Sequence, residues 1–160
     1  MNVTIRTATV NDVASLARLN ADVQRRHAEA MPSIFKQPSA ELLPTVMFSE
    51  PLSDPNSIFF VAENGEDAVG YLWAEISQRS ETQLTYARDS IMIHHISVQP
   101  AYQRQGVGAQ LIAAVKDLAR QEQIATVKLD TWSFNTDAQA FFARQGFTIY
   151  NYRLWTEVAL

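Results

Sequence analysis

The first part of the chain changes from a strand pattern to a helix pattern. Residues 3–7 alternate apolar and polar side chains, which predicts a half-buried strand. Thr9 or Asn11 is then placed to cap a helix, because both residue types accept hydrogen bonds from the free N–H groups of a first helical turn. The helix is predicted by apolar residues at helical spacing, namely Val13, Leu16, Ala17, Leu19 and Val23.

A second helical stretch is predicted at residues 39–48, with Ser39 as its cap. Pro44 lies inside this stretch and argues against it, since an interior proline removes one helix hydrogen bond. Pro51 is expected to end the helix, before a turn that leads into the strands of the second half.

Strand patterns then occur on both sides of a long helix. Residues 57–62 and 69–77 predict a hairpin, and residues 90–98 predict a third strand that Pro100 ends. Further on, the sequence predicts a helix at 107–119, a strand at 126–131, a helix at 135–145 and one or two strands in 147–158. This order favours a single α/β domain over residues 1–160, with helices on both faces of a mixed, mostly antiparallel sheet of about six to seven strands.

Composition supports a packed domain and excludes several classes of function. Of the 160 residues, 47% are apolar and 19% are charged, and the net charge is −4, so no nucleic-acid partner is expected. The absence of cysteine excludes disulfides, thiolate metal sites and cysteine nucleophiles. The N-terminus lacks the apolar run of a signal peptide, and no stretch is long enough to cross a membrane. We therefore expect a cytoplasmic protein.

The turn at residues 103–108 has features that suit a phosphate group. It opens the long helix, whose first N–H groups are unpaired and carry partial positive charge. Gly106 and Gly108 let the backbone approach a ligand closely, and Arg104 adds a full positive charge. The turn is not a P-loop, which needs Lys and Ser or Thr after its last glycine, nor a GxGxxG fingerprint, which needs glycine where Leu111 stands. Spacing alone leaves a purely structural role of the glycines open.

Two segments carry longer patterns around and after this turn. The first is Val98-x-Pro100 followed by Gln103-x-x-Gly106-x-Gly108, and the second is Asn135-x-x-Ala138-x-x-Phe141-Phe142-x-x-x-Gly146-Phe147. The first resembles motif A of the GNAT superfamily of N-acetyltransferases, and the second resembles motif B of the same family. One predicted helix and one predicted strand separate the two motifs, as in that family.

The resemblance implies a GNAT-like fold with a splayed strand pair and acetyl-CoA as cosubstrate. The strand that ends at Val98 would separate from the next one, and the pantetheine arm would lie in the gap. The contacts it implies are the strand residues Ile96, Ser97 and Val98 and the turn residues Gln103, Arg104, Gln105, Gly106, Val107, Gly108 and Ala109. Asn135 matches a position that often contacts the pantetheine arm, although asparagine there also suits a helix N-cap.

By the same resemblance, an acceptor amine attacks the thioester directly, and the reaction needs a group that takes up a proton. A lysine-like ammonium has a pKa of about 10.4, so the free amine costs on the order of 4–5 kcal/mol at pH 7. His94 stands where many relatives carry Glu, and imidazole suits this task. The adjacent His95 would face the other side of the strand, which also argues against a metal site. Glu75 is the next candidate base, and the N–H of Val98 would stabilise the thioester oxygen.

Motif B departs from the family at Phe142, where relatives often carry a tyrosine that protonates the leaving thiolate. Phe142 would still line the cofactor site, but it has no proton to donate, so Tyr150 or Tyr152 is a candidate for that task. Core packing is an alternative role for Phe142.

The sequence thus predicts an N-acetyltransferase that acts on a primary amine of a small molecule or peptide. Two alternatives stay open, a non-catalytic acyl-CoA-binding module and a nucleotide-binding domain of another kind. The acceptor is not identified by any motif. Since relatives commonly pair, a homodimer is also expected.

Overall fold

Five strands and four α-helices make up the described part of the chain, residues 2–39 and 45–158 of a computed structural model. Residues 1–130 form one compact unit and residues 131–160 form a second. The elements are β1 (Val3–Thr7), the 3₁₀ turn η1 (Val10–Asp12), α1 (Val13–Ala30), α2 (Thr45–Ser53), β2 (Ser57–Asn64), β3 (Asp67–Arg79), β4 (Arg88–Val98), the 3₁₀ turn η2 (Pro100–Tyr102), α3 (Val107–Gln121), β5 (Val127–Leu129) and α4 (Thr136–Arg144).

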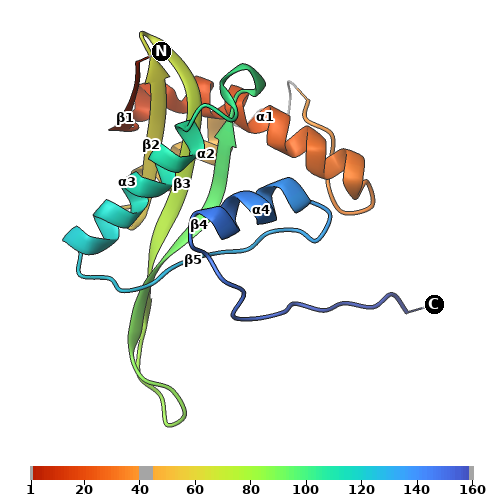
Figure 1. Cartoon of the computed structure of the whole chain (residues 1–160). Helices are drawn as coiled ribbons and strands as arrows, with labels where there is room; N and C mark the ends of the chain where they lie inside the picture. Colours follow the sequence, from red (N-terminus) through yellow and green to blue (C-terminus); the bar gives the residue numbers. More distant parts are fainter. Residues whose placement is uncertain (1, 40–44, 159–160) are drawn as a thin grey trace. The chain divides into compact units, whose positions relative to one another are not determined.

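The strands form one sheet in the order β1-β2-β3-β4-β5. The first three pairings are antiparallel, and β4 pairs with β5 in parallel, so the prediction of a mixed, mostly antiparallel sheet is confirmed. β3 and β4 are the longest strands and continue as a two-stranded ribbon past their neighbours, as Figure 1 shows.

The predicted strand count of six to seven is wrong, because the tail supplies no strand between residues 147 and 158. The tail alternates apolar and polar residues, but a strand also needs a neighbouring backbone to pair with. From Ile149 on, its large apolar side chains are exposed instead, for example 88% for Leu154. The pattern alone could not reveal the missing partner strand.

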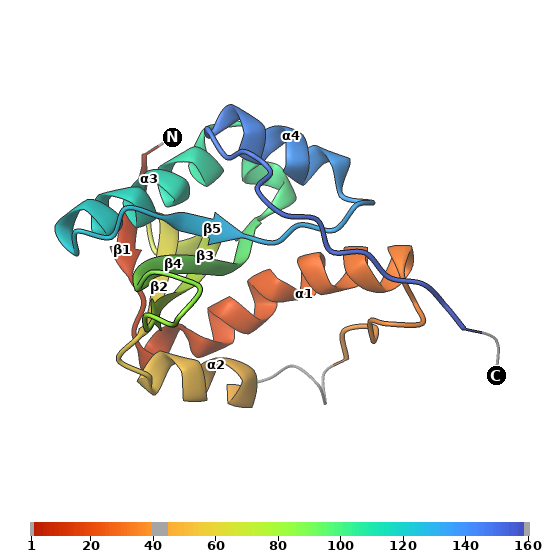
Figure 2. The ribbon, with the colours of Figure 1, turned by 90° about the horizontal axis from the view of Figure 1, so that it is seen from below.

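Helices cover both faces of the sheet within residues 1–130. Figure 2 shows α3 on one face and α1 with α2 on the other. The apolar stripe of α3 is buried, as its spacing predicted. On the α1 face, buried residues from both helices and from β2 and β3 form one cluster: Leu16, Ala17, Leu19, Phe48, Phe59, Val61, Ala68 and Tyr71.

The second helix differs from its prediction. α2 spans Thr45–Ser53, so Pro51 lies inside it rather than after it. Phe48 is fully buried and Leu52 packs against the same cluster, and this burial offsets the hydrogen bond that a proline removes. Ser39 is not helical, and Pro44 lies outside the described residues.

An ion pair holds the start of α1 against the sheet. Arg6 donates to both carboxylate oxygens of Asp12, at 2.8 and 2.7 Å, and also pairs with Glu63 of β2. Thr9 and Asp12 form a capping box, in which the Thr9 N–H donates to Asp12 at 2.7 Å. These bonds, above all those from Arg6, lower the pKa of Asp12 to about 2.

Replacing Asp12 by Ala should reduce the free energy of unfolding by about 2 kcal/mol at pH 7, because both the cap and the ion pair are lost. The folded-state pKa of Asp12 is depressed, so its stabilisation is present above about pH 4 and is lost as the pH falls toward 2. Denaturant unfolding of both proteins should therefore give curves that differ at pH 7 and converge at low pH.

Asp117→Ala is the matched control, since Asp117 forms an exposed pair with Arg120 on α3. It should change the free energy of unfolding by less than about 0.5 kcal/mol. Equal losses in the two variants, or a loss in Asp12→Ala that does not depend on pH, would contradict this account.

Candidate active site

A β-bulge in β4 places His94 between two regular stretches of the ladder with β3. Trp73 pairs with His95 and Ala74 pairs with Ile93, so His94 is an extra residue without a partner in β3. The bulge breaks the alternation of side chains, and both imidazoles reach the indole of Trp73, with ring centroids 4.7 and 5.0 Å away. The prediction that the two histidines face opposite sides is therefore wrong.

The structure brings together the two candidate bases, His94 and Glu75. His94 Nε2 lies 3.0 Å from a carboxylate oxygen of Glu75, and the two side chains are 31% and 43% exposed. An ionised carboxylate only accepts hydrogen bonds, so Nε2 of a neutral His94 carries the hydrogen and Nδ1 carries the lone pair. This orientation leaves Nδ1 able to accept a proton.

His95 lies at the end of a partly buried polar chain that no sequence pattern predicted. Its Nδ1 is 3.2 Å from the hydroxyl of Tyr71, which donates to Asn20 of α1 at 2.9 Å. Burial above all, together with the electrostatic effect of the neighbouring His94 and His27, lowers the pKa of His95 to about 4. The only sequence signal was a polar Asn20 inside the apolar stripe of α1, and nothing linked it to Tyr71.

The parallel ladder between β4 and β5 covers only residues 91–93 of β4, although that strand runs on to Val98. The ladder ends where β5 ends, at Leu129, so within the described residues no strand pairs with this edge of β4 beyond Ile93. The N–H of Gln99 donates to the Val69 carbonyl at 2.9 Å, on the β3 side. Since backbone groups alternate along a strand, those of Ile96 and Val98 face the open edge.

The turn after β4 presents a row of unpaired backbone donors. Arg104 and Gly106 both have positive φ, at 58° and 87°, and Gly106 is the N-cap of α3. Such a left-handed pair turns successive N–H groups toward a common point, an arrangement that binds anions. Within the described chain, the N–H groups of residues 104–109 donate to no backbone or side-chain acceptor. The side chain of Gln103 fixes the turn by donating to the Val98 carbonyl at 2.9 Å.

Two other predicted contacts, Ser97 and Val107, are placed less simply, and Gly70 of β3 lies beside Ser97. Ser97 is buried, and its hydroxyl donates to the Leu19 carbonyl of α1 at 2.8 Å, so it presents no group at the open edge. The side chain of Val107 is buried, which leaves only its N–H. Gly70 lies opposite Val98, and a Cβ there would meet the Ser97 carbonyl at 2.9 Å, so this close approach of β3 and β4 requires glycine.

Asn135 and Phe142 belong to the unit of residues 131–160. Asn135 is the N-cap of α4, and its side-chain oxygen accepts from the Ala138 N–H at 3.3 Å. Phe142 is buried and packs edge-on against Phe147, with centroids 5.7 Å apart. The tail tyrosines Tyr150 and Tyr152 are both exposed.

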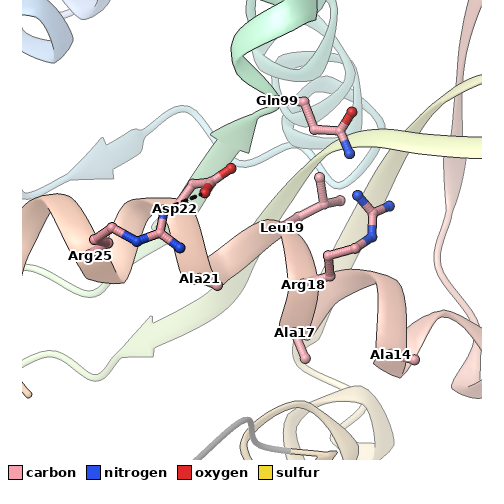
Figure 3. A pocket seen from close by; sticks show the side chains of 8 residues that line it. All are labelled: Ala14, Ala17, Arg18, Leu19, Ala21, Asp22, Arg25 and Gln99. Carbon is pink, nitrogen blue, oxygen red and sulfur yellow. Dashed lines mark hydrogen bonds and ion pairs between the residues drawn. The ribbon is translucent and has the colours of Figure 1, made fainter. Parts of the chain in front are cut away.

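A surface pocket lies along α1, next to the end of β4. Figure 3 shows Gln99, which directly follows β4, opposite Leu19 and Arg18, while Asp22 and Arg25 pair with each other at 2.9 Å. Neither His94 nor Glu75 lines this pocket. In residues 2–39 and 45–158, no three His, Asp or Glu residues are grouped to hold a metal ion, and no helix is long and apolar enough to cross a membrane.

Comparison with known sequences gives a consistent assignment. Residues 21–147 match the acetyltransferase (GNAT) family. The chain is 32% identical over 143 residues to N-alpha-acetyltransferase RimI of Mycobacterium tuberculosis, and this match covers 88% of the chain and 82% of that protein. This chain spans between 40% and 55% of the length of three other N-acetyltransferases, and it is 23% to 30% identical to them in the aligned regions.

Solved structures share the architecture. A tetramutant of the BH1408 protein from Bacillus halodurans superposes with a TM-score of 0.92 at 21% identity, over 97% of this chain and 99% of that one. AAC(6')-Iy, in complex with a bisubstrate analogue CoA-S-monomethyl-acetylneamine, gives a TM-score of 0.73 at 19% identity, over 100% of both chains. Because the family match covers most of its length, this chain belongs to the acetyltransferase (GNAT) family.

Proposed function

We propose that this chain is an N-acetyltransferase that moves the acetyl group of acetyl-CoA to a primary amine of a small molecule or peptide. The observation that carries the proposal is the open edge of β4, which leads directly into the unpaired N–H groups of residues 104–109. The family match runs through both compact units, so we treat residues 1–160 as one transferase domain.

The open edge and the turn fit the two chemically different ends of acetyl-CoA. The pantetheine arm contains amides, which pair with strand backbone, and we assign Ile96 and Val98 to this contact. The pyrophosphate is an anion, which suits the N–H groups of Arg104, Gln105, Gly106, Val107, Gly108 and Ala109 at the N-terminus of α3. Ser97 stays outside this set. Asn135 and Phe142 are kept as candidate contacts of the second unit.

Bound acetyl-CoA would supply the acetyl thioester, and the residues of the chain would manage the proton. His94 Nδ1 takes a proton from the acceptor ammonium, and Glu75 holds the imidazole through Nε2 and stabilises its charged form. The amine then attacks the thioester carbonyl, whose oxygen is stabilised by the N–H of Val98. An amine acceptor is supported by two relatives. The name of RimI specifies an α-amine, and AAC(6')-Iy was solved with a bisubstrate analogue that joins CoA to acetylneamine.

Replacing Gly106 by Ala should weaken acetyl-CoA binding about tenfold, because a left-handed φ strains any residue with a Cβ and turns the N–H groups away. Gly65→Ala is the matched control, since Gly65 has φ of 67° in the β2–β3 turn, and should lose similar stability without losing affinity. Thermal-shift measurements with acetyl-CoA, ATP and NAD compare the affinity of each variant for these ligands. Acetyl-CoA at 100 times its Kd should stabilise the protein by about 2.7 kcal/mol. Equal affinities in both variants, or a shift with ATP or NAD alone, would contradict the assignment.

Replacing His94 by Ala should lower the rate of CoA release with a panel of amines by about 10²–10⁴-fold, while acetyl-CoA affinity stays the same. Glu75→Gln should lower the rate of CoA release about tenfold or more. Its side-chain amide can donate to Nε2 of His94, which would move the hydrogen of the imidazole to Nδ1. Glu66→Gln removes an exposed carboxylate in the β2–β3 turn and should have no effect. Unchanged turnover in His94→Ala would remove His94 from the mechanism. Acetyl-CoA binding without CoA release from any amine would favour a non-catalytic binding module.

A further inference from the structure

His95 has one ring nitrogen held inside the fold and one without a protein partner. Tyr71 has a single hydroxyl hydrogen, and Asn20 Oδ1 can only accept, so this hydrogen lies in the bond between them. The bond between Tyr71 and Nδ1 of His95 therefore takes its hydrogen from Nδ1. The second nitrogen, Nε2, is left with a lone pair.

Nε2 of His95 has no partner among the described residues and is not sealed from solvent. No hydrogen bond joins it to any described residue, and no sealed side-chain nitrogen or oxygen lacks a partner, so Nε2 reaches solvent. The lowered pKa of His95 keeps this ring neutral at physiological pH. His94 and His95 are also the first two residues of β4 beyond its ladder with β5, and both rings contact Trp73. The two rings that carry these lone pairs, on His94 Nδ1 and His95 Nε2, thus contact the same indole.

The fate of the three ammonium hydrogens gives these lone pairs distinct uses. The first leaves as a proton before the amine attacks. The nitrogen–carbon bond then forms and the carbon–sulfur bond breaks. The second hydrogen leaves after these two steps and goes to the CoA thiolate. The third stays on the nitrogen of the product amide. His94 Nδ1 serves the first hydrogen, and the third needs an acceptor throughout the reaction, since an unpaired N–H in a dry site costs free energy.

We propose that His95 Nε2 accepts the N–H that a primary amine keeps, and that Tyr71 and Asn20 position this nitrogen by fixing the tautomer. The inference rests on the proposed function and deepens it, because it makes His95 the residue that selects primary over secondary amines. A secondary amine still has one N–H when it attacks, but this hydrogen must go to the CoA thiolate. The amide that forms then has no N–H left for Nε2, so the end of the reaction lacks this bond.

The test compares primary amines with their N-methyl derivatives: phenethylamine, tyramine, putrescine and glycinamide, each in both forms. Wild-type protein should prefer the primary amine in kcat/KM about tenfold or more. His95→Asn, whose amide reaches only the Nδ1 position, should remove this preference, and His95→Gln, whose amide lies near the Nε2 position, should largely keep it. His27→Gln, a control on α1, should keep the wild-type ratio. A wild-type ratio in His95→Asn overturns this inference alone, whereas no CoA release by wild-type protein with any amine overturns the proposed function and this inference together.

¹⁵N NMR of the histidine rings gives a second readout that does not need a folded His95 variant. In wild-type protein, His95 should show a protonated Nδ1 and an unprotonated Nε2, and Tyr71→Phe should abolish this single tautomer. With CoA bound, the product N-acetylphenethylamine, which keeps an N–H, should shift the Nε2 resonance of His95 more than N-acetyl-N-methylphenethylamine, which has none. A protonated Nε2 in the wild-type protein, or equal shifts with the two amides, would overturn the proposal.

Discussion

The candidate site depends on the early end of the parallel ladder between β4 and β5. β5 pairs with only residues 91–93, and beyond them one edge of β4 has backbone groups without a neighbouring strand. An open edge in the middle of a sheet leaves donors and acceptors to be satisfied by other partners. Here the edge continues into a turn whose N–H groups are also unpaired. A ligand with amides at one end and phosphates at the other matches this order of groups along the chain, from the strand edge to the turn.

The bulge at His94 is the second constraint, and it acts at the point where the open edge begins. Without the extra residue, alternation would place one histidine on each face of the sheet. With it, both rings lie against Trp73, where Glu75 reaches His94 and Tyr71 reaches His95. The two rings then differ in environment, since one is partly exposed and paired with a carboxylate and the other is neutral, half-buried and bonded to a tyrosine hydroxyl. Such a difference assigns separate tasks to chemically identical side chains.

The sequence predicted the parts of this protein that local patterns determine. The α3 stripe, the Thr9 cap, the hairpin and the glycine turn follow from spacing and from residue type, and all are present. The strand count was wrong because pairing of the tail depends on a partner that no local pattern encodes. The bulge was missed for a similar reason, since it is a mismatch of register between β3 and β4. The chain from Asn20 through Tyr71 to His95 joins residues far apart in sequence and could be seen only once the fold was known.

The most direct measurement is a ¹H–¹⁵N NMR titration of the backbone amides with CoA. We expect large shifts at Ile96, Val98 and residues 104–109, and small shifts at His95 and Ser97, whose N–H groups face β3. This alternation along β4 distinguishes contact with the open edge from a general change in the strand. Uniform shifts along β4, or shifts that leave the turn at 104–109 unaffected, would contradict the claim that the open edge and the turn form one cofactor site.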